Sequence, residues 1–141
     1  MGQQQSKQFN FEDVQQMIKN KNTIIINVLP TSQQSCLIKN TLSINSEVKI
    51  INELLKTNKS VNIIVYGKNP SDINVKKKQK QLISLGFYNV FIYIGGLFEW
   101  LLLQDIYGKD EFPTTSEELD LLKFKPPSNY YNNNLLIHDV D

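Results

Sequence analysis

The sequence predicts a single α/β domain with a mostly parallel central sheet and helices on both faces. Two observations support this prediction: continuous apolar runs rich in β-branched residues, and stretches of helical periodicity that separate them. The chain has 141 residues, of which 40% are hydrophobic. That length is typical of one domain with a substantial core.

Strands and helices alternate along the chain, as they do in a parallel sheet with crossover helices. The strands predicted from apolar runs span 23–29, 61–66 and 90–94. The helices predicted from periodicity span 10–20, 47–56, 73–85 and 97–107. Asn10 is expected to cap the first helix, and Gly86 is expected to end the third. A further short strand is expected within 37–44, and Val48 is expected on the apolar side of its helix.

The character of the sequence changes after Gly108. Residues 109–141 are polar and are expected to form an extended tail with one short helix over 116–123, capped by Ser116. The expected organisation is a flexible N-terminus at 1–8, a domain at 9–113 and a C-terminal extension at 114–141. The extension contains an apolar triplet that is expected to bind a partner: Leu135, Leu136 and Ile137.

Composition excludes several classes of function. The formal net charge is +1, so there is no electrostatic reason to expect nucleic acid as a partner. All 15 basic residues are lysine, which rules out any bidentate guanidinium site. Cys36 is the one cysteine and His138 the one histidine, so a Cys-rich zinc site is excluded as well. We expect no metal, no cofactor and a cytoplasmic location.

The first residues match an N-myristoylation signal, with Gly2 after the initiator methionine and Ser6 at the sixth position. The alternative is a Gln-rich start that matches the pattern by chance. One acyl chain gives only marginal membrane binding, with an association constant on the order of 10⁴ M⁻¹, so firm anchoring needs a second signal. A lysine cluster could supply it or could simply be a solvated helix face: Lys76, Lys77, Lys78 and Lys80.

A set of short motifs follows in a characteristic order. The motifs are, along the chain, Tyr66-Gly67, Leu85-Gly86-Phe87, Gly95-Gly96 and Trp100. Their order and spacing across 9–113 resemble the rhodanese-like (Cdc25-like) domain family. The resemblance places Asn40 where the family has a glycine, so Asn40 is expected to adopt a positive φ.

The resemblance also implies where chemistry would occur. In that family a cysteine nucleophile directly follows the strand that ends in tyrosine, and the backbone N–H groups of its loop hold the anion. Gly67 stands at that position here, and Asn27 and Leu29 replace the family's bracing Asp and Arg. We therefore expect neither sulfur transfer nor phosphocysteine chemistry at this loop. The vacant active-site loop, which could still hold a small anion beside Lys68, comprises Gly67, Lys68, Asn69, Pro70, Ser71 and Asp72.

The leading hypothesis is a non-catalytic interaction or structural module with a protein partner. One alternative is a divergent sulfurtransferase that uses Cys36, and another is a peripheral membrane adaptor myristoylated on Gly2. The sequence is rich in Asn, Ile and Lys and lacks Ala, which suggests an AT-rich genome such as that of a ciliate. A cytoskeletal or ciliary assembly is one expected setting.

Overall fold

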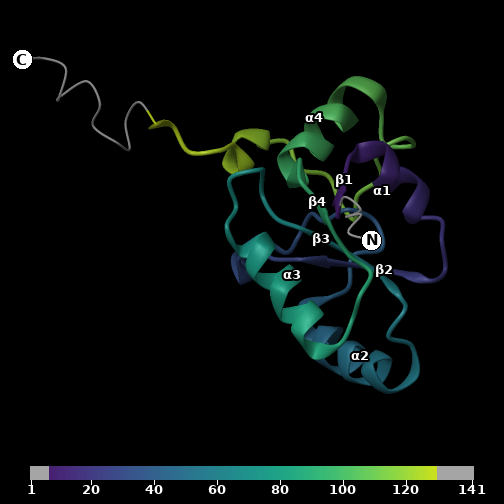
Figure 1. Ribbon diagram of the computed structural model, residues 1–141. Helices are drawn as coiled ribbons and strands as arrows, with labels where there is room; N and C mark the ends of the chain where they lie inside the picture. Colours follow the sequence, from purple (N-terminus) through teal and green to yellow (C-terminus); the bar gives the residue numbers. More distant parts are fainter. Residues whose placement is uncertain (1–6, 130–141) are drawn as a thin grey trace, which may run out of the picture.

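A four-stranded parallel sheet forms the centre of the molecule (Figure 1). The computed structural model describes residues 7–129. The strands, in chain order, are β1 (Gln8–Phe9), β2 (Thr23–Asn27), β3 (Asn62–Tyr66) and β4 (Val90–Tyr93). Their order in the sheet is β1-β4-β3-β2, and every neighbouring pair is parallel. The predicted sheet is confirmed.

Helices cover both faces of this sheet, as predicted. They are α1 (Phe11–Met17), α2 (Ile44–Thr57), α3 (Asn74–Leu85) and α4 (Gly96–Tyr107). In Figure 1, α1 and α4 lie on one side of the strands and α2 and α3 on the other. Each face has its own apolar core because successive strand side chains point in opposite directions. Ile64 and Tyr66 of β3 belong to the core with α4, while Ile63 and Val65 belong to the core with α2 and α3.

Local sequence explains where the helices begin and end. Asn10 and Asp13 form a reciprocal capping box at α1. The backbone N–H of Asn10 donates to Oδ2 of Asp13, and that of Asp13 donates to Oδ1 of Asn10, both at 2.9 Å. Gly86 ends α3 with a φ of +125°. Both residues act as predicted, although α1 ends at Met17, three residues before the predicted end at Asn20.

Two predictions in the middle of the chain are wrong. Segment 37–44 forms no strand; it makes only isolated bridges, Ile38 with Thr114 and Thr41 with Ile25. The chain turns between them at Asn40, whose φ of 72° confirms the expected left-handed conformation. Val48 is 70% exposed, because α2 turns its Glu47 side inward to pair with Lys78 of α3.

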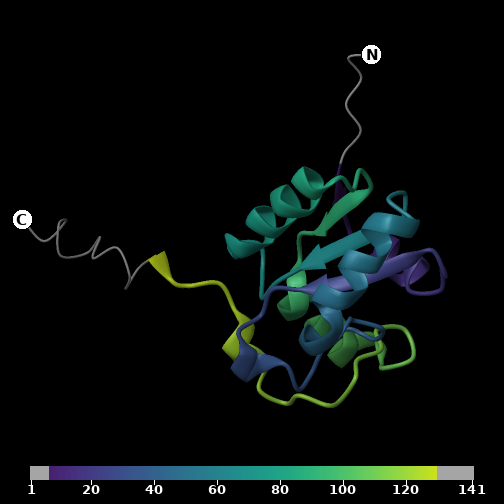
Figure 2. The same ribbon diagram turned by 90° about the horizontal axis from the view of Figure 1, so that it is seen from below.

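The segment after α4 returns along the domain (Figure 2). The helix predicted over 116–123 is wrong; the segment is extended until a single 3₁₀ turn, η2 (Leu121–Phe124). Ser116 begins no helix because it is tied to a distant segment: its hydroxyl donates to the Ser35 carbonyl oxygen at 2.7 Å. Phe112 and Phe124, at 3% and 1% exposure, pack this segment into the core.

Candidate functional site

The loop between β3 and α3 lies at the carboxyl ends of the strands, where open parallel sheets bind their ligands. Gly67 directly follows the last residue of β3. The structure brings together the residues that the sequence assigned to this loop: Gly67, Lys68, Asn69, Pro70, Ser71 and Asp72. Figure 1 shows the loop beside the start of α4.

The Asp72 carboxylate fills the interior of the loop. Its Oδ2 accepts the backbone N–H of Lys68 at 3.0 Å, and its Oδ1 accepts the N–H of Asn74 at 3.1 Å. A β-carbon at Gly67 would overlap this carboxylate and would lie 2.8 Å from Cγ2 of Val75. The loop thus directs backbone donors at an anion that the chain itself provides.

Asn69 anchors the loop to the C-terminal segment. Its Oδ1 accepts the N–H of Ser71 at 2.8 Å, an Asx turn that shapes the loop. Its Nδ2 donates to the Phe124 carbonyl oxygen, also at 2.8 Å. Asn69 is only 6% exposed. Asn69, which the sequence assigned to the vacant loop, therefore holds that loop against the C-terminal segment.

The glycine pair before α4 allows close approach to the same loop. The N–H of Leu97 donates to the Gly67 carbonyl oxygen and that of Phe98 to the Lys68 carbonyl oxygen, both at 2.9 Å. Gly96 has a φ of +70°, and a β-carbon there would lie 2.7 Å from the Asn69 nitrogen. Only glycine permits this contact without displacing backbone.

A groove of about 410 Å³ opens beside the loop. Lys68 and Ile73 line it from the loop side, and Val28 lines it from the end of β2. Lys123 and Lys125 close it from the C-terminal segment, and Lys123 pairs with Glu118 at 2.6 Å, a contact that lowers the pKa of Glu118. Sequence reasoning missed both lysines because it placed Lys123 at the end of a short helix and both residues in an extension separate from the loop.

A second polar cluster replaces the bracing pair of the resembled family. Asn27 is 4% exposed, and its Oδ1 accepts the N–H of Leu29 at 2.9 Å and Nε2 of Gln34 at 2.8 Å. Gln34 also donates to the Leu29 carbonyl oxygen at 3.1 Å. The two amides together tie down the chain after β2. Gln34 was not identified from the sequence, because nothing local distinguishes it from other loop residues.

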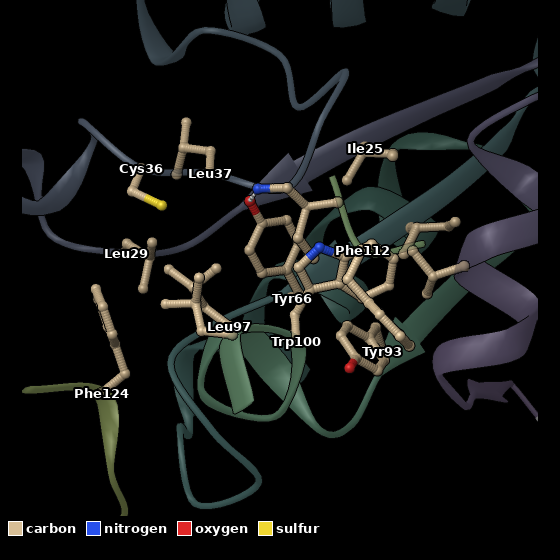
Figure 3. Packing of buried hydrophobic residues seen from close by; sticks show 14 residues of the cluster. Ile25, Leu29, Cys36, Leu37, Tyr66, Tyr93, Leu97, Trp100, Phe112 and Phe124 are labelled. Atoms are coloured by element: carbon tan, nitrogen blue, oxygen red, sulfur yellow. Dashed lines mark hydrogen bonds between the residues drawn. The ribbon is translucent and has the colours of Figure 1, made fainter. Parts of the chain in front are cut away.

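Tyr66, the last residue of β3, is buried in the core that the sheet forms with α4 (Figure 3). Its hydroxyl accepts the N–H of Ile38 at 3.1 Å and is 2.8 Å from Oγ1 of Thr41. Complete burial raises the pKa of Tyr66, so the phenol stays neutral. Tyr66 joins β3 to the 37–44 segment and takes no part in the groove.

Cys36 is a core residue. It is 2% exposed, and its thiol donates to the Ser116 carbonyl oxygen at 3.2 Å. Figure 3 shows its sulfur directed among Leu29, Leu37 and their neighbours. Burial raises the pKa of this thiol, which disfavours the thiolate that a nucleophile needs.

We expect Cys36 to react slowly with a disulfide reagent such as 5,5′-dithiobis(2-nitrobenzoic acid) at neutral pH. The native rate should be on the order of 100-fold below the rate in urea, because reaction requires local opening of the core. Both rates are measured from the absorbance of the 5-thio-2-nitrobenzoate anion that the reagent releases. Equal rates in buffer and in urea would contradict the buried position.

Other sequence-based assignments lie outside the described residues. These are the acylation site Gly2 and the apolar triplet Leu135, Leu136 and Ile137. Among residues 7–129, no helix is long and apolar enough to cross a membrane.

Comparisons of the sequence and of the fold with known proteins agree on one family. The family model described as the rhodanese-like domain matches residues 10–103. The fold is similar to the Alr3790 protein of Anabaena sp. (TM-score 0.57, 21% identity, 82% of this chain and 97% of that chain). It is also similar to Saccharomyces cerevisiae Ygr203w, described as a homolog of single-domain rhodanese and the Cdc25 phosphatase catalytic domain (TM-score 0.59, 15% identity, 82% and 91%).

A third similar structure is the single-domain sulfurtransferase RDL2 of Saccharomyces cerevisiae (TM-score 0.52, 17% identity, 76% of this chain and 98% of that chain). No curated protein matches the chain.

Proposed function

The chain belongs to the rhodanese-like domain family, and on that premise we propose that it is a non-catalytic member that acts as an interaction or structural module. One observation carries the proposal. Gly67 occupies the position directly after β3 where the family has its nucleophile, and the Asp72 carboxylate accepts the loop's N–H groups.

A thiol at position 67 would compete with this carboxylate for the interior of the loop. A cysteine at position 67 would place its β-carbon onto the Asp72 carboxylate and 2.8 Å from Val75. Even without that overlap, an adjacent negative charge disfavours a thiolate and repels an anionic sulfur donor. RDL2 is described as a sulfurtransferase; we propose that the present chain shares its scaffold without its chemistry.

The groove beside the loop is the proposed partner-binding site. It offers the cations of Lys68 and Lys125 next to the apolar side chains of Val28 and Ile73. A protein segment that carries acidic and apolar side chains would complement it. Binding by the triplet Leu135, Leu136 and Ile137, and a setting in a cytoplasmic, cytoskeletal or ciliary assembly, remain parts of the proposal.

The purified chain, incubated with thiosulfate and cyanide, is expected to form no thiocyanate above a no-enzyme control. An active sulfurtransferase such as RDL2 serves as the positive control. Thiocyanate is measured as its coloured ferric complex. Robust turnover that disappears in the Cys36→Ser variant would overturn the proposal in favour of a sulfurtransferase that uses Cys36. Turnover that persists in Cys36→Ser would overturn it as well.

A further inference from the structure

The amino-end edge of the sheet gathers loops that are far apart in sequence. Because all strands are parallel, β2, β3 and β4 all begin at this edge, opposite the groove. The segments that lead into them are 18–22, 56–60 and 84–89, and Lys7 enters β1 at the same edge.

Hydrogen bonds join these segments into one surface. Asn58 Nδ2 donates to Asn22 Oδ1 at 2.8 Å, and Asn89 Nδ2 donates to the Ser60 carbonyl oxygen at 2.9 Å. Lys7 Nζ donates to the Tyr88 carbonyl oxygen at 3.2 Å. Lys7 and all three loops therefore lie side by side.

This surface, which we call the basic edge, is rich in lysine and free of acids. Its lysines are Lys7, Lys19, Lys21, Lys56 and Lys59. Segments 18–22, 56–60 and 84–89 contain no Asp or Glu. The ion pairs found among residues 7–129 use Lys78, Lys109 and Lys123, so they leave the lysines of the basic edge unneutralised.

The lysines of the basic edge thus make a locally positive surface, although the chain as a whole carries a net charge of only +1. Three acidic residues lie toward the opposite edge: Glu12 and Asp13 stand in the first turn of α1, and Asp72 lies in the loop after β3. Leu85 and Tyr88 on the basic edge are 46% and 59% exposed, which adds apolar surface among the lysines. Tyr is a side chain suited to a membrane interface.

We propose that the basic edge docks on an anionic lipid membrane and supplies the second signal for an acyl chain on Gly2. Lys7, which lies at this edge, follows Gly2 by only five positions in the sequence. One acyl chain alone binds marginally, and juxtaposed lysines provide the electrostatic part of stable attachment. Of the lysines of α3, Lys78 is paired with Glu47, and Lys76 and Lys77 lie in the helix's first turn, at the far end, so these three are not main contributors. This proposal does not rest on the loss of sulfur-transfer chemistry.

The test measures partition of the full chain, myristoylated by co-expression with an N-myristoyltransferase, onto sedimented vesicles. Vesicles of phosphatidylcholine are compared with vesicles that also contain phosphatidylserine. The edge variant Lys19→Gln/Lys21→Gln/Lys56→Gln should bind the anionic vesicles about 100-fold more weakly, since each lysine near such a surface contributes about fivefold. Its binding to neutral vesicles should not change.

The matched control is Lys76→Gln/Lys77→Gln/Lys109→Gln, which removes the same charge from exposed positions away from the basic edge. It should lose less than about fivefold, because those lysines lie beyond a Debye length of a membrane docked at the edge. Gly2→Ala should abolish the residual binding to neutral vesicles. Equal losses in the two triple variants, or no binding of the myristoylated wild-type chain, would overturn the proposal. Binding to duplex DNA is measured in parallel. An edge variant that keeps its binding to vesicles but loses binding to DNA would also overturn the proposal, because the basic edge would then contact nucleic acid.

Discussion

Replacement of Gly96 by alanine is expected to lower the free energy of unfolding by about 3 kcal/mol or more. Two costs add. The φ of +70° disfavours any residue with a β-carbon, and the new methyl group would lie 2.7 Å from the Asn69 nitrogen and 2.8 Å from the Gly67 carbonyl oxygen. Backbone atoms cannot rotate away as a side chain could, so the start of α4 must separate from the loop. Urea unfolding followed by circular dichroism measures the loss.

Gly86→Ala is the matched control for Gly96→Ala. Gly86 also has a positive φ, of +125°, but a methyl group there would meet only the flexible Lys59 side chain, at 3.6 Å or more. This variant should lose about 1–3 kcal/mol, from backbone strain alone, because its φ lies outside the left-handed helical region. A larger loss in Gly96→Ala than in Gly86→Ala would come from the contact between α4 and the loop. A smaller loss in Gly96→Ala would mean that this close approach contributes little.

Truncation of Trp100 to alanine is expected to cost about 3–5 kcal/mol, a large part of a typical domain's stability. Trp100 is fully buried, and its ring makes edge contacts with Tyr93 and Phe112 at centroid distances of 5.9 and 5.0 Å. Its Nε1 donates to the Pro113 carbonyl oxygen at 3.1 Å. The variant therefore leaves a cavity and frees the segment that follows α4.

The measurement for Trp100→Ala uses circular dichroism, because Trp100 is the single tryptophan and its fluorescence is lost with it. Ile106→Ala, in the same helix but 69% exposed, should change stability by less than about 0.5 kcal/mol. Trp100→Phe should fall between the two, because it retains a ring but leaves the Pro113 oxygen without its donor. If Trp100→Ala cost no more than Ile106→Ala, the assigned core position would be wrong.

Elements defined by local signals could be predicted from the sequence. The runs that became β2, β3 and β4 are apolar on both faces, and Asn10 and Gly86 are cap residues whose effect is confined to one helix turn. The loop that begins at Gly67 was located because it directly follows such a run.

Features that depend on distant segments could not be predicted. The orientation of α2 depends on the pair between Glu47 and Lys78, which lie on different helices. The burial of Cys36 depends on Ser116, 80 positions away, which also holds that segment out of a helix. The segments around Cys36 and Ser116 are polar and have no helical or strand periodicity. No local pattern could therefore indicate that they pair.

The carboxylate inside the loop also constrains how this protein could evolve. A β-carbon at position 67 requires the Asp72 carboxylate and Val75 to shift, and loss of Asp72 alone removes the acceptors of the Lys68 and Asn74 N–H groups. Each single substitution therefore carries a cost in stability. On the proposal that this chain lacks the family's nucleophile, we expect positions 67 and 72 to change together, whereas lysines around the groove can change one at a time.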